Sequence, residues 1–188
     1  MATIALLINP SEIKATTLID ENVDEKLIRT VIEESQNIHV HPIIGTGIFN
    51  ELKTQINAGT LTAFNTTLIS TYLQPALKYW VLFEGIDVFT YKFMNKSVVK
   101  RNGENSNAID VDELRRLQDR FRDKAEWYSE RATKYLQENE ASFPLYYNPG
   151  SGIDTIYPKA TNYSTGIFLG DSLKSNDEPD CECWQKYP

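Results

Sequence analysis

The stretch from Asn65 to Met94 constrains the fold of this chain most, because apolar side chains occupy almost every turn of it. A polar stripe at the helical repeat survives only near its start, at Thr67, Thr71, Gln74 and Lys78. A helix that is apolar nearly all round must be covered on most sides. Charged residues interrupt the run well short of about 18 apolar residues, so we expect protein rather than lipid as the cover. The stretch predicts a central helix with a kink or division at Pro75.

Three shorter helices are predicted before the central one. An apolar run from Ile4 to Ile8 precedes them and fits an edge strand or an extended arm. The helices are recognised by capping residues, by a proline in the first turn and by closing glycines. Their expected spans are Asn9 or Ser11 to Thr17, Asn22 to about Val40 with Pro42 as the stop, and Gly45 to Gly59.

A polar segment and one more long helix follow the central helix. Asn102-Gly103 is a strong turn signal, so we expect a projecting β-hairpin or loop over residues 95–109. Asp110 caps a helix that runs to about Asn139, with apolar residues in a nearly seven-residue repeat. We expect this helix to pack antiparallel along the central one.

The C-terminal part differs in composition from the rest. Residues 140–188 are rich in Pro, Gly, Asn, Ser and Tyr and show no periodicity, which is typical of an extended segment. Their aromatic side chains favour contact with a surface, either that of the same copy or of a neighbour. We therefore predict a mainly α protein in two parts: a helical bundle with two long helices over residues 1–139, and an extended C-terminal arm over residues 140–188.

The sequence offers no catalytic, cofactor or metal site. The only histidines, His39 and His41, lie two residues apart without a carboxylate cluster at ligand spacing, which favours capping or packing roles. Gly45-Thr46-Gly47 lacks the Gly-Lys-Ser/Thr of a phosphate-binding loop, so we interpret it as a turn. Cys181 and Cys183 form a single pair, and zinc would need ligands from elsewhere. The beginning of the chain lacks the features of a signal peptide, which predicts a cytoplasmic protein with no membrane partner and with reduced thiols.

Two carboxylates on the central helix are the main candidates for an unusual environment. Glu84 and Asp87 lie one turn apart on an otherwise apolar helix, so we expect cations to neutralise them. The last helix supplies candidates for this role, Arg115, Arg116, Arg120 and Arg122. We interpret the pairs as structural and expect no enzyme; a small hydrolase using Glu84, Asp87 and His39 is the weaker alternative.

The distribution of charge points to contacts between copies. The net charge is −7, which argues against generic nucleic-acid coating, but Lys92 to Lys134 holds 11 basic and 8 acidic residues. This local charge of +3 suits a head-to-tail contact with the acidic remainder of another copy. The predicted subunit or partner contacts are Lys96, Lys100, Arg101, Arg116, Arg120, Phe143, Tyr146, Tyr147 and Trp184. A helical regulatory module that binds nucleic acid through Lys96, Lys100 and Arg101 is the alternative.

Several segments, taken in order, resemble one family. These are Asn22-Val23-Asp24, Pro42-Ile43-Ile44-Gly45-Thr46, Tyr72-Leu73-Gln74-Pro75-Ala76-Leu77, Asn95-Lys96-Ser97-Val98-Val99 and Glu104-Asn105-Ser106. Over roughly residues 8–139 the chain resembles the head-to-tail connector (adaptor) proteins of tailed bacteriophages, particularly those of Bacteroides-infecting, crAss-like phages. The arm after residue 140 departs from the compact pattern of that family.

The resemblance implies a virion structural protein without a cofactor. Members are mainly helical and form a ring, usually of twelve copies, beneath the portal, where they join capsid to tail around the DNA channel. The implied partners are other copies of the chain, the portal protein, a tail or second ring protein, and DNA that passes through the lumen without sequence-specific binding. The implied location is the portal vertex of the virion, and the host cytoplasm during assembly.

Overall fold

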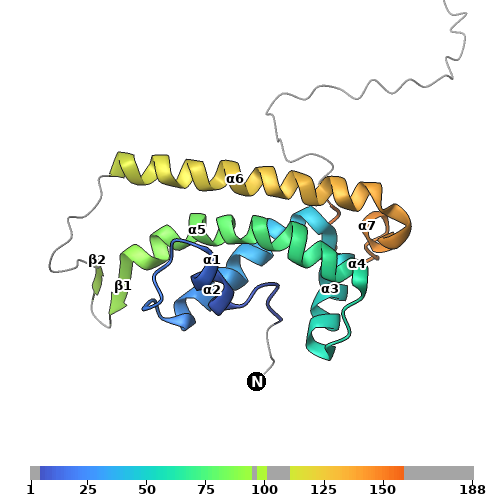
Figure 1. The fold of residues 1–188 in the computed structure, drawn as a ribbon, viewed down its shortest axis with the longest axis horizontal. Helices are drawn as coiled ribbons and strands as arrows, with labels where there is room; N and C mark the ends of the chain where they lie inside the picture. Colours follow the sequence, from blue (N-terminus) through green and yellow to red (C-terminus); the bar gives the residue numbers. More distant parts are fainter. Residues whose placement is uncertain (1–4, 95–96, 101–110, 159–188) are drawn as a thin grey trace, which may run out of the picture.

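The computed structural model describes residues 5–94, 97–100 and 111–158 (Figure 1), and these residues are mainly helical, as the sequence predicts. The first half holds α1, α2, a π-helical stretch η1 and α3. A second π-helical stretch, η2, joins α4 to α5, and two strands precede the long α6. The elements are α1 (Pro10–Thr16), α2 (Glu25–Ser35), η1 (Gln36–Val40), α3 (His41–Ala58), α4 (Ala63–Thr67), η2 (Leu68–Leu73), α5 (Gln74–Thr90), β1 (Tyr91–Met94), β2 (Ser97–Lys100), α6 (Val111–Glu138), the 3₁₀ turn η3 (Glu140–Ser142) and α7 (Pro144–Tyr147).

Local sequence signals set most helix ends. At the start of α2, the Asp24 carboxylate accepts a hydrogen bond from the Lys26 backbone N–H. At the start of α4, the Thr62 hydroxyl oxygen accepts one from the Asn65 backbone N–H. Gly59 ends α3 in the left-handed conformation, with φ of 67°. The predicted end of α3 at Gly59 is thereby confirmed, whereas α2 is capped by Asp24 and so begins two residues later than the predicted start at Asn22.

Both prolines within the helical runs follow a π-helical stretch. The prediction that Pro42 stops the helix is wrong, because the chain continues from η1 into α3 and its backbone leaves helical geometry only at Gly45, with φ of 77° and ψ of 162°. Pro42 lacks a backbone N–H, and the wider turn of η1 ends at Val40, two residues before it. At Pro75, the predicted division of the central helix is present as the junction between η2 and α5.

The central helix is shorter at its C-terminal end than predicted. The residues Tyr91 to Met94, apolar except for Lys92, form β1 rather than the last turn of α5, and β1 pairs antiparallel with β2. Val98 and Val99 of β2 pair with Phe93 and Lys92 of β1. The predicted turn itself lies outside the described residues. Aromatic and β-branched side chains favour strands, and this preference outweighs the helical spacing here.

The core forms because α5 is covered on two sides. Figure 1 shows α6 running antiparallel along one side of α5, with α1 and α2 on the other. Small and apolar side chains of α6 face α5, and Leu77 and Val81 of α5 are fully buried. The two-sided cover explains why α5 is apolar nearly all round, and the predicted pairing of the two long helices is confirmed.

The predicted arm does not begin at residue 140. Phe143 and Tyr146 are 3% and 5% exposed and belong to the core, because η3 and α7 fold back against the bundle. Their prediction as subunit contacts is therefore wrong. The same burial raises the pKa of the Tyr146 phenol. Residues 148–158 have no helix or strand, and they lie against the start of α3. Beyond Pro158 the arm lies outside the described residues.

Candidate functional site

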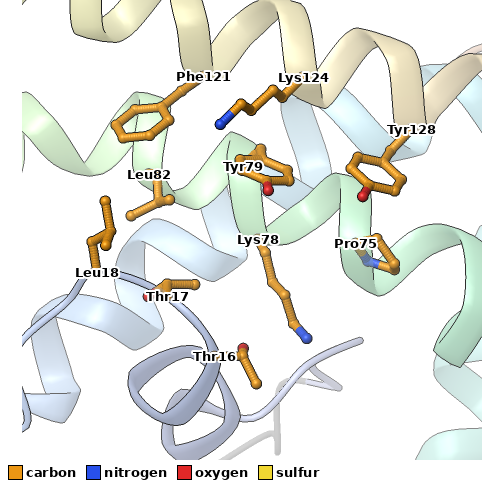
Figure 2. Close-up of a pocket in the computed structure, with 10 residues that line it drawn as sticks. All are labelled: Thr16, Thr17, Leu18, Pro75, Lys78, Tyr79, Leu82, Phe121, Lys124 and Tyr128. Atoms are coloured by element: carbon orange, nitrogen blue, oxygen red, sulfur yellow. The ribbon is translucent and has the colours of Figure 1, made fainter.

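A groove between the end of α1, α5 and α6 is the clearest candidate site among the described residues. Its volume is about 490 Å³, within the range of pockets that bind ligands or side chains of a partner. Figure 2 shows Tyr79 between two lysine side chains, with apolar groups on one side and Tyr128 on the other. The lining residues are Thr16, Thr17, Leu18, Pro75, Lys78, Tyr79, Leu82, Phe121, Lys124 and Tyr128.

The helical repeat places these residues on facing stripes. Pro75, Lys78, Tyr79 and Leu82 are spaced three and four residues apart along α5, and Phe121, Lys124 and Tyr128 have the same spacing along α6. The end of α1 closes the third side, because α1 stops after Thr16 and the chain turns away. Three elements far apart in the sequence thus form one groove.

The charged groups that line the groove are both cationic. Lys124 Nζ lies 5.3 Å from the centre of the Tyr79 ring, a cation–π contact, and among the described residues no carboxylate forms an ion pair with it. Lys78 Nζ lies 3.4 Å from Glu12 Oε1 of α1. Because Glu12 does not line the groove, the groove itself is positive.

Aromatic rings form one wall of the groove and continue past it. Tyr79 and Tyr128 stack with their centres 5.6 Å apart. A second hollow of about 320 Å³ adjoins the first, sharing Tyr79, Lys124 and Tyr128 and adding Asp123 and Trp127. Trp127 is 55% exposed, and the Arg131 guanidinium lies 5.2 Å from its ring. This surface offers apolar contact and positive charge together.

The histidines take structural roles. The His39 ring stacks on Trp80 at 3.7 Å, and His39 Nε2 lies 2.7 Å from Glu84 Oε1. Trp80 Nε1–H in turn donates to Ser129 Oγ of α6. His41 stacks on Phe49. These contacts confirm packing roles for both histidines.

The predicted pairing of Glu84 with arginines of the last helix is wrong. His39 occupies that position, and Arg122 instead pairs with Asp119, Asp123 and Glu126 of its own helix. The Asp87 side chain is not among those described. No nucleophile is hydrogen-bonded to the His39–Glu84 pair in the described part of the chain, so the pair does not form a triad.

A second polar cluster fastens residues 148–158 to α3. The Thr46 N–H donates to the Ile156 carbonyl, and the Ile156 N–H donates to Thr46 Oγ1. Thr46 Oγ1 also lies 2.9 Å from His41 Nε2. The Thr46 hydroxyl oxygen already accepts a hydrogen bond from the Ile156 N–H, so the hydroxyl hydrogen is available to donate to Nε2 of a neutral His41 ring. Burial, and then the charge of Lys53, lowers the pKa of His41, which favours this neutral form.

The predicted contact residues do not gather at the groove. Arg116 and Arg120 are exposed on α6, Tyr147 is exposed on α7, and Lys100 is in β2. Lys96, Arg101 and Trp184 lie outside the described residues, as do Cys181 and Cys183. Sequence reasoning missed Leu18, Lys124 and Trp127, and it treated Lys78 only as part of a polar stripe. The signal available in the sequence was that the lining residues of α5 and of α6 both recur at intervals of three and four residues.

The described ranges contain no group of three or more His, Cys, Asp or Glu side chains that could hold a metal ion. Nor is any of the helices described long and apolar enough to cross a membrane.

The comparison with protein families places the sequence in one of them. The family model of DUF6712, a family of unknown function, matches residues 40–156, more than half of the chain. The chain belongs to the DUF6712 family. The DUF6712 match covers the two sides of the groove that α5 and α6 provide, but not α1. No curated protein and no solved structure matches this DUF6712 chain.

Proposed function

We propose that this DUF6712 protein is a virion structural protein that forms a ring below the portal and connects capsid to tail around the DNA channel. The resemblance of residues 8–139 to phage head-to-tail connectors supports the proposal. Twelve copies, the portal protein and a tail or second ring protein are the partners that this resemblance supplies.

The observation that carries the proposal is the presence of two separate groups of exposed apolar side chains. One group comes from α4 and the residue before its cap, from α7, which Figure 1 shows beside α4 at one end of the bundle, and from residues 148–158, which follow α7 in the chain. It consists of Leu61, Phe64, Tyr147, Ile153, Ile156 and Tyr157. The other group, Leu18 and Trp127, borders the groove. Gathered apolar side chains on a protein surface mark contacts with partners.

Two unlike surfaces on one subunit are what a ring needs. A contact between different surfaces repeats from copy to copy, and it closes into a ring when the rotation allows it. In this proposal the helical bundle forms the ring wall, and a projection over residues 95–109 reaches a neighbour or the portal. The arm beyond Pro158 clamps adjacent subunits or the next ring, and no catalytic step is involved.

The test is the mass of the purified 21.5-kDa chain in solution, with and without portal protein. A discrete assembly of about twelve copies, alone or on the portal, supports the proposal. Trp127→Gln and Tyr157→Gln each remove one of the two surfaces and abolish the ring. Glu34→Gln, an exposed change on α2, leaves it intact.

Mixing the two variants tests whether the contact is between unlike surfaces. Each variant keeps one intact surface, so a mixture of Trp127→Gln and Tyr157→Gln chains forms dimers that cannot grow further. A chain that stays monomeric even with portal present contradicts the proposal. If that monomer also binds DNA in a steeply salt-dependent manner, the regulatory alternative replaces it.

A further inference from the structure

We propose that the groove between α1, α5 and α6 binds the acidic segment Asp177–Trp184 of this chain's own C-terminal part. The proposal concerns a docking site and its occupant. It holds whether the segment comes from the same copy or another, so it does not depend on ring formation.

The groove combines positive charge with apolar and aromatic side chains. Lys78 and Lys124 give it positive charge, and the carboxylate of Glu12 partly neutralises only Lys78. Apart from Thr16 and Thr17, its remaining lining is apolar or aromatic, and Leu18 stands at its rim with 83% of its surface exposed. A suitable occupant therefore combines several carboxylates with a large apolar side chain.

One segment of the chain, Asp177–Trp184, combines several carboxylates with a large apolar side chain. Asp177, Glu178, Asp180 and Glu182 place four carboxylates within six residues, and Trp184 follows two residues after the last of them. Pro179 favours an extended backbone, which suits a peptide lying in a groove. The preceding residues 159–176 contain two lysines and a single acidic residue, so they lack this complementarity.

The chain beyond Pro158 is long enough for the acidic segment to reach the groove. The described chain ends at Pro158, which packs against Gly45 at the start of α3. Residues 159–176 can span at most about 60 Å when extended. The 28-residue helix α6, which runs the length of the bundle, is only about 42 Å long. The acidic segment can therefore reach the groove of its own or an adjacent copy.

The experiment is photocrosslinking in the full-length chain under reducing conditions. p-Benzoylphenylalanine replaces Leu18 at the groove rim, and the crosslinked peptides are identified by mass spectrometry. We expect crosslinks to residues 177–188. The same probe at Thr54, an exposed position of α3, gives none to that segment.

Charge changes on α6 separate a specific site from chance contact. Lys124→Glu lowers the crosslink yield roughly fivefold, the effect of losing about 1 kcal/mol of ion-pair and cation–π attraction. Lys134→Glu, the same change at an exposed position of α6 away from the groove, leaves the yield unchanged. Replacing the four acidic residues of the segment by lysine restores the yield in the Lys124→Glu chain. Circular dichroism confirms that each variant is folded.

Two results overturn the proposal. One is a Leu18 probe that reacts only with segments other than 177–188. The other is a yield that Lys124→Glu and Lys134→Glu alter equally. If the protein forms no ring but the charge-dependent crosslink is present, the proposed function is contradicted and the docking proposal is not.

Discussion

Replacing Gly45 by Ala should destabilise the protein strongly, because this position combines a rare backbone conformation with a close contact. Its φ of 77° and ψ of 162° lie in a region essentially restricted to glycine, where another residue costs about 1–3 kcal/mol. A Cβ atom there would lie 2.8 Å from Cγ and Cδ of Pro158 and 3.3 Å from the Ile156 carbonyl oxygen. Such overpacking costs about 1–3 kcal/mol more. The expected loss is about 4 kcal/mol, or roughly 8–16 °C in Tm for a chain of this size.

Two further variants separate these contributions in urea and thermal unfolding. Gly59→Ala places a Cβ in open space at φ of 67°, so it costs only the left-handed backbone term of about 1–2 kcal/mol. Pro158→Ala removes the two ring atoms that Cβ would meet, so Gly45→Ala should cost about 1–3 kcal/mol less in that background. A loss for Gly45→Ala no larger than that for Gly59→Ala, with no coupling to Pro158, would refute this reasoning.

Three other predictions concern buried polar groups. Ser129→Ala leaves the Trp80 indole N–H without its acceptor, so the unfolding free energy in urea falls by about 1–3 kcal/mol; in a Trp80→Phe background this cost should shrink toward zero. Gln36 is fully buried and bonds backbone groups of residues 5 and 7, so Gln36→Leu should cost about 2 kcal/mol and accelerate amide hydrogen exchange near residue 7. Burial and Lys53 lower the pKa of His41 from 6.5, so the unfolded chain takes up a proton first and stability falls as the pH drops through 6.5. His41→Gln should make the unfolding free energy less dependent on pH in that range, and an unchanged profile would contradict this.

Local signals in the sequence predicted the helices well where they did not depend on distant contacts. The closing Gly59 was found from residue type alone, and the long partner of the central helix from its apolar repeat; the start of α2 was placed at Asn22, two residues before the actual cap, Asp24. Pro42 was misread because the sequence does not show that a π-helical stretch precedes it. Tyr91 to Met94 was misread because the same apolar residues satisfy a helix or a strand, and the pairing with β2 decides between them.

The site was harder to predict than the fold because its residues come from three elements. Lys78 and Lys124 lie on helices whose relative rotation determines whether they share a groove, and periodicity alone does not give that rotation. Glu84 shows the same limit: its partner is not an arginine of α6 but His39, 45 positions away in sequence. Phe143 and Tyr146 looked like arm residues because the short helical turn that buries them has no periodic pattern.

The π-helical stretch η2 has a consequence for which changes in chain length the protein tolerates. A π-helical turn takes one residue more than an α-helical turn, so it acts as a built-in insertion at Leu68–Leu73. Deleting one residue there would let an α-helix form without a break, but it would rotate everything downstream by about 100° relative to α4. The α5 and α6 sides of the groove would then turn away from Thr16, Thr17 and Leu18, which precede the deletion, and the groove would lose its third side. Individual side chains on the exposed face of this stretch can vary, whereas its number of residues cannot.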